Sequence, residues 1–230
     1  MHFEILVEDA SGELLLNSLL PKILGAVGNP HTWRTHPYRG IGRLPRDLRG
    51  KTDPWKRVLL DWLPKILAGY GASLRAQNSA VVVVVDLDGR DCIGFKRELL
   101  DVLEGCRPKP RCLFRIAIEE TEAWLLGDRE AIVRSFPRAK RSVLDSYVQD
   151  SICGTWEKLA DALFQGGAAA LSADGYPRIG EEKCRWASQI GPRLDVESNR
   201  SHSLQVFRRG LLRLAGAERQ PRHDDGVRAE

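Results

Sequence analysis

The chain lacks any apolar stretch as long as the roughly 18 to 20 residues that a bilayer-spanning helix needs. Its first residues show no basic region followed by an apolar run, so no signal peptide is expected. The five cysteines are odd in number and scattered, without a C-x-x-C pair. These absences argue against a membrane protein, a disulfide framework and a zinc site, and they predict a cytoplasmic protein with reduced thiols.

What the sequence does contain is an ordinary globular composition. Of its 230 residues 43% are hydrophobic and 29% are charged, which is enough for one sizeable core with a small appendage. The net charge of +4 is small but unevenly spread. Residues 31–57, the basic segment, hold eight Arg or Lys against two Asp. Such a cluster indicates a phosphate-contacting surface, although a solvated loop is the alternative interpretation.

Apolar runs and helical periodicities alternate along the first half of the chain. Strands are expected at 3–8, 32–35, 80–85 and 111–118, and helices at 11–27, 55–74 and 93–106. Ser11 is the expected N-cap of the first helix, and Pro64 should split or kink the second. The run "AVVVVV" does not alternate with polar residues, so both of its faces should be covered. This pattern predicts an α/β fold with a mainly parallel sheet flanked by helices.

After about Leu126 the strand patterns stop and only helical patterns follow, at 155–164, 180–191 and 203–216. We therefore expect three parts: an α/β core at 1–128, an α-helical C-terminal extension at 129–216 packed on that core, and a disordered tail at 217–230. The tail is expected to be disordered because it lacks apolar residues. Trp124 and Trp186 are expected to lie in the core.

Acidic residues follow three of the predicted strands. They are Glu8, Asp9 and Glu13 after the first strand, Asp86, Asp88 and Asp91 after the valine run, and Glu119, Glu120 and Glu122 after the last strand. Parallel strands end at one rim of a sheet, where α/β proteins bind ligands. Crowded carboxylates repel one another, and a hard cation such as Mg²⁺ removes that cost. Helix capping is the alternative for Asp91, and the helix dipole for Glu119 and Glu120.

Several segments carry a family resemblance. "ILVE", "VVVVVDLDGRD", "IAIEETEAWLLGD" and "KCRWASQIGPRLDVESNRSHSLQVFRRGL" together resemble a bacterial family of TOPRIM-like proteins, over residues 1 to about 216. TOPRIM domains are metal-binding α/β domains shared by topoisomerases, primases and the nucleases of the overcoming-lysogenisation-defect (OLD) group. One departure is that Asp9 stands where the family usually has glycine.

The resemblance implies a role for each candidate residue. Glu8 would be a general acid/base or a metal ligand, and Asp86 and Asp88 would bind Mg²⁺ or Mn²⁺. Candidates for ligands of a second ion, in a two-metal mechanism, are Glu13, Asp91 and Glu122. Lys183 is a candidate for stabilising charge in the transition state. Candidates for holding nucleic-acid phosphates are Arg34, His36, Arg39, Arg43 and Arg200.

The leading hypothesis is a Mg²⁺-dependent TOPRIM-type nuclease, with DNA expected as its substrate ahead of RNA, in a phage-defence or mobile-element setting that implies an ATPase partner. A first alternative is a phosphatase of the haloacid-dehalogenase type, because an apolar strand followed by D-x-D-G fits its nucleophile motif. Arg90 departs from that motif, which normally lies on the first strand. A second alternative is a non-catalytic subunit that keeps the acidic rim and acts through the ATPase.

Overall fold

The computed structural model describes residues 1–44, 58–74, 77–151 and 154–216. Four strands form one all-parallel sheet in the order β2-β1-β3-β4, which confirms the expected α/β fold. The strands are β1 (His2–Val7), β2 (Thr32–Pro37), β3 (Ser79–Asp86) and β4 (Cys112–Ala117). The expected tail at 217–230 and the part of the basic segment at 45–57 lie outside the described residues.

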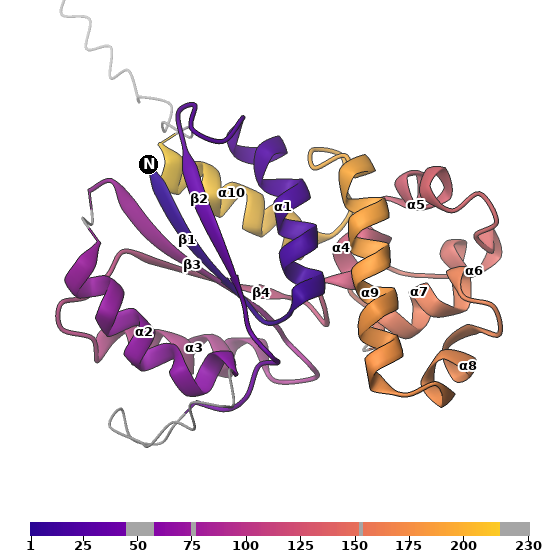
Figure 1. Ribbon diagram of the computed structural model, residues 1–230, viewed down its shortest axis with the longest axis horizontal. Helices are drawn as coiled ribbons and strands as arrows, with labels where there is room; N and C mark the ends of the chain where they lie inside the picture. Colours follow the sequence, from indigo (N-terminus) through magenta and orange to yellow (C-terminus); the bar gives the residue numbers. More distant parts are fainter. Residues whose placement is uncertain (45–57, 75–76, 152–153, 217–230) are drawn as a thin grey trace, which may run out of the picture.

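Helices cover both faces of this sheet (Figure 1). One face is packed by α2 (Leu59–Ser73) and α3 (Cys92–Glu104), and the other by α1 (Ala10–Leu24) and α10 (His202–Ala215). Successive side chains of a strand point to opposite faces. Accordingly, Val81, Val83 and Val85 pack with α2 and α3, whereas Val82 and Val84 pack with α1 and α10. The unbroken valine run is therefore buried on both sides.

Beyond β4 the chain builds a helical body beside the sheet, on the right in Figure 1. Its elements are α4 (Glu122–Leu126), α5 (Arg129–Ser135), α6 (Arg141–Asp145), α7 (Thr155–Leu163), α8 (Gly167–Ala173), α9 (Tyr176–Ile190) and a 3₁₀ turn, Gly191–Arg193. The long helix α9 packs along α1 and so joins this body to the sheet. Trp124 and Trp186 are fully buried, as expected.

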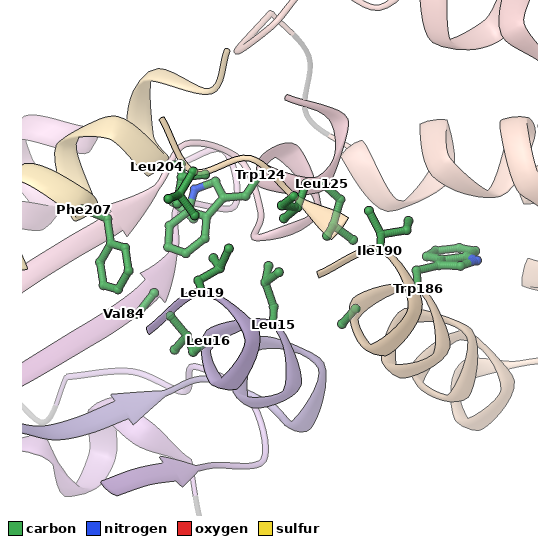
Figure 2. Packing of buried hydrophobic residues seen from close by; sticks show 14 of the residues in the cluster. Leu15, Leu16, Leu19, Val84, Trp124, Leu125, Trp186, Ile190, Leu204 and Phe207 are labelled. Carbon is green, nitrogen blue, oxygen red and sulfur yellow. The ribbon is translucent and has the colours of Figure 1, made fainter. Parts of the chain in front are cut away.

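Helix α10 is packed apart from the rest of the expected extension 129–216. It returns to the sheet and packs on β4 and α1. Its Phe207 stacks on Trp124 with ring centroids 5.1 Å apart, and Figure 2 shows both rings beside Val84 and Leu19. The core of the sheet domain is therefore closed by residues from both ends of the chain.

The expected cap of α1 and the expected split at Pro64 were wrong. Asp9, not Ser11, caps α1: its Oδ1 accepts a hydrogen bond from the Gly12 amide at 2.7 Å. Pro64 does not divide the second helix, because α2 runs unbroken through it. Pro64 is buried between the leucines of α2, and this packing offsets the hydrogen bond that proline cannot donate. Among the described helices, none is long and apolar enough to span a membrane.

Candidate active site

The ends of β1 and β3 lie side by side at the centre of the sheet. From β1 the chain moves outward to β2 on one side, and from β3 it moves outward to β4 on the other. Open α/β sheets bind ligands at such a switch point, beyond the carboxyl ends of the strands. Glu8 directly follows β1, and Asp86 is the last residue of β3. The Asp86 amide donates to Glu8 Oε2 at 3.3 Å, so the two strand ends are in contact.

A cleft of about 490 Å³ opens at this point. Its carboxylates are Glu8, Asp9, Asp86, Asp88 and Glu120, and its cations are Arg39 and Lys183. One wall is a single face of α9 that includes Tyr176, Ile179 and Lys183. The structure thus brings together Glu8, Asp86, Asp88, Lys183 and Arg39, five residues that the sequence predicted to act in one site.

The turn after β3 is held in an unusual backbone conformation. Asp88 has φ 49° and Gly89 has φ 66°, both in the left-handed region. Leu87, between the two aspartates, packs against the core formed with α2 and α3. Glu119, at the neighbouring strand end, also has φ 70°, and its carbonyl accepts from the Leu87 amide at 3.1 Å. Non-glycine residues with positive φ gather at functional sites, where the surrounding structure holds the strain.

Burial and mutual repulsion dominate the electrostatics of the cleft. Burial, with a contribution from the Asp88 carboxylate, raises the pKa of Glu8 to about 7. Burial and the nearby Glu8 raise the pKa of Asp86, and burial and Glu120 raise the pKa of Asp88. In all three cases burial is the largest cause and a neighbouring carboxylate adds to it, so a cation nearby would favour the ionised forms.

Lys183 supplies one such cation. Its Nζ lies 3.2 Å from Glu122 Oε2; the Glu122 side chain is buried, and the Lys183 side chain is 13% exposed toward the cleft. Burial alone would lower the pKa of Lys183, but Glu122, Glu120 and Asp86 outweigh it and raise the pKa. The ammonium group therefore stays protonated between the buried Glu122 and the open cleft.

The donor set of the cleft suits a hard divalent cation. Mg²⁺ binds a few carboxylates together with waters and phosphate oxygens, and Glu8, Asp86 and Asp88 offer carboxylates from two adjacent strand ends. Within the described ranges, however, no group of three or more His, Cys, Asp or Glu side chains is already arranged to hold an ion. The cleft therefore fits Mg²⁺ by the type of its side chains and by its place at the strand ends.

The three residues expected to hold a second ion lie outside the lining of the cleft. Asp91 caps α3, where its Oδ2 accepts from the Gly94 amide at 2.6 Å. Glu13 accepts a hydrogen bond from Thr35 Oγ1 at 2.8 Å. Glu122 is buried behind Lys183 as its ion-pair partner. Each carboxylate already has a partner within the protein.

Four of the five residues expected to hold phosphates also lie away from the cleft. His36 Nε2 lies 2.5 Å from Glu4 Oε2, which also accepts from the Tyr70 hydroxyl at 3.3 Å, beneath α2. Arg34 lies near this same Tyr70. The backbone amide of Arg43 donates to Asp61, and Arg200 lines hollows of the helical body beside Arg129. Arg39 alone among the five lines the cleft.

Sequence reasoning gave no role in the site to several residues that line the cleft, among them Asp9, Glu120 and Tyr176. Asp9 combines its capping role in α1 with a place on the cleft wall. Glu120 accepts from Thr155 Oγ1 at 2.9 Å and from the Trp156 amide at 3.0 Å, so it ties the rim to α7. Tyr176 opens α9 and is 83% exposed. Its position after Gly175 and before Pro177 marks a helix start, but nothing local links it to Glu8.

The fold and the site define an α/β protein with a carboxylate-lined cleft at the switch point of a parallel sheet. Comparison with known families, with curated proteins and with solved structures finds no match. The chemistry of the cleft is therefore argued from its own residues.

Proposed function

We propose that this protein is a Mg²⁺- or Mn²⁺-dependent hydrolase of phosphodiester bonds in nucleic acid, a nuclease of the TOPRIM type. The observation that carries the proposal is the convergence of Glu8, Asp86 and Asp88 with Lys183 and Arg39 in one cleft at the switch point. The excess of carboxylates in the cleft favours binding of a divalent metal ion. The basic side chains beside these carboxylates favour binding of a phosphate group. A phosphodiester brought to bound Mg²⁺ satisfies both groups.

The position of each residue in the cleft suggests its role in the proposed reaction. Asp86 and Asp88 would hold the ion, which supplies charge neutralisation and activation of a water molecule. Glu8 faces the cleft from the adjacent strand and would either complete the ligand set or accept the proton of that water. Lys183 and Arg39 would neutralise phosphate oxygens, and Lys183 remains charged because Glu122 lies against it.

The test is incubation of the purified protein with single-stranded, duplex and supercoiled DNA and with RNA, in Mg²⁺ or Mn²⁺. We expect cleavage that the double variant Asp86→Asn with Asp88→Asn abolishes. Asp91→Asn is the matched control: it changes the third acid of the same segment, which caps α3 outside the cleft. The Asp91→Asn variant should still cleave nucleic acid. Absence of cleavage under every condition, or cleavage that survives the double variant, would overturn the proposal.

The alternatives have weaker support. The phosphatase hypothesis needs the D-x-D-G motif on the first strand, whereas here Asp86 ends β3 and Arg90 departs from the motif. An ATPase partner, and with it the non-catalytic subunit, rests on the family resemblance. We retain a cytoplasmic location as part of the proposal, since reduced cysteines suit that compartment.

A further inference from the structure

The mouth of the cleft carries an exposed aromatic ring. Tyr176 is 83% exposed, the highest value among the large hydrophobic side chains of the described residues. It nevertheless lines the same cleft as Glu8, Asp86 and Asp88. A single exposed aromatic side chain is ordinary on a protein surface, so what distinguishes Tyr176 is its place in the lining of a charged cleft.

The geometry of α9 relates this ring to the floor of the cleft. Tyr176, Ile179 and Lys183 occur at the spacing i, i+3 and i+7, which puts them on one face of the helix. Seven residues span two turns, or about 10 Å along the axis. The wall thus passes from an aromatic ring through an aliphatic side chain to an ammonium group beside the carboxylates.

Space is left open along this wall at Gly180. A Cβ built there would meet no atom within 4 Å, although the residue lies in the middle of a helix and lines the cleft. Glycine in a helix interior costs about 1 kcal/mol relative to alanine. The open strip beside Tyr176 therefore leaves room for a flat group against the ring.

We infer that Tyr176 stacks on a base of single-stranded nucleic acid whose neighbouring phosphate lies at Lys183 and the carboxylates, so that the cleft selects unpaired strands. This inference rests on the proposed function and names its substrate class. A ring and a phosphate-binding group on one helix face match the alternation of base and phosphate along a strand. A duplex keeps its bases stacked inside, where Tyr176 could not contact their faces.

The test measures binding apart from cleavage. Labelled single-stranded DNA, single-stranded RNA and a blunt DNA duplex are titrated with the full-length protein in Ca²⁺, and affinity is read by fluorescence anisotropy. Tyr176→Leu removes the ring but keeps an apolar side chain, and Tyr176→Phe keeps the ring. We expect the Leu variant to bind single strands roughly 5- to 100-fold more weakly and the Phe variant to bind within about twofold of wild type. Duplex binding should be weaker and insensitive to both changes.

A second variant addresses the open strip. Gly180→Leu places a side chain in the cleft at a solvent-open helix position, so the fold should be retained and single-strand binding reduced. Its thermal unfolding is measured beside that of wild type, and the DNA and RNA arms report which sugar the cleft prefers. Equal binding by wild type and Tyr176→Leu, or an equal loss for duplex, would overturn the role of the ring.

The outcomes separate this inference from the nuclease proposal. Ring-dependent binding of single strands without cleavage in Mg²⁺ or Mn²⁺ would overturn the nuclease and keep the stacking role. Cleavage together with binding that does not depend on the Tyr176 ring would overturn the stacking role and keep the nuclease. A protein that binds none of the three nucleic acids would overturn both.

Discussion

At the scale of single residues, the ion pair of Lys183 and Glu122 places a positive charge beside the carboxylates of the cleft. Glu122 is buried and Lys183 is largely buried, and Lys183 also lies near Asp86 and Glu120. A buried charge is tolerated only when a partner compensates the lost hydration. Each member of the pair therefore depends on the other, and removing one alone should be costly.

Breaking this pair should be costly in a pH-dependent way. We expect Lys183→Met to lower the free energy of unfolding by about 3 to 5 kcal/mol at pH 8, since Glu122 is left as an unpaired buried carboxylate. Burial already raises the pKa of Glu122 to about 7, and losing the ammonium would raise it further. When folding raises the pKa of a carboxyl group, the stability linked to its protonated form is fully present below the pKa of the unfolded state. That stability is lost as the pH rises through the pKa of the folded state. The loss should therefore shrink at pH 5.

The measurement is urea unfolding in EDTA at pH 5 and pH 8. Lys183→Met combined with Glu122→Gln is the control, because it removes both charges and should recover most of the loss at pH 8. A single variant that unfolds identically at both pH values, or a double variant no better than the single one, would show that the pair does not act as described.

At the scale of elements, the junction after α4 depends on a close approach. Gly127 ends α4, and Arg200, just before α10, donates its amide to the Gly127 carbonyl at 3.0 Å. A Cβ on Gly127 would lie 2.1 Å from Asn199 Oδ1 and 2.9 Å from the Ser201 amide. The second contact is with backbone, so it cannot be relieved by rotating a side chain.

Glycine-to-alanine substitutions at two positions should therefore change the free energy of unfolding in opposite directions. Gly127→Ala is expected to destabilise the protein by about 1 to 3 kcal/mol through overpacking. Gly69→Ala is the matched control: Gly69 lies in α2 with nothing within 4 Å of a built Cβ. It should stabilise by up to about 1 kcal/mol, because alanine is the better helix former. Thermal denaturation of both variants gives the comparison, and equal shifts would contradict the packing described for the junction.

The sequence predicted the helices and strands better than it predicted which of them, and which of their side chains, lie next to one another. The valine run and the acids at three strand ends depend on local patterns, and they correctly located Glu8, Asp86 and Asp88 in one cleft. The strand order that makes β1 and β3 neighbours is not local, and neither is the recruitment of His36 by Glu4 and Tyr70. Tyr176 joins the cleft from a helix that begins 90 residues after Asp86, and no pattern in the chain connects the two.

At the scale of the whole molecule, the return of α10 makes the sheet domain dependent on the C-terminal part of the chain. Leu204, Phe207 and Leu211 of α10 are fully buried in the cluster that includes Val82 and Val84. Fully burying one such side chain stabilises a protein by roughly 1.5 to 3 kcal/mol. Three of them amount to a large part of the 5 to 15 kcal/mol that typically separates folded from unfolded domains.

A chain ending at residue 128 should therefore fail to fold, although its sequence contains the whole sheet. We expect a chain ending at residue 200, which lacks only α10 of the described elements, to lose its cooperative thermal transition and the dispersion of its NMR amide spectrum. Without α10, Trp124 and the α1 face of β3 would be exposed to water. A chain ending at residue 216 keeps every described residue and is the control, expected to unfold cooperatively. A well-dispersed spectrum from residues 1–128 would show instead that the sheet and helices α1 to α4 form an independent unit, with α10 an accessory to it.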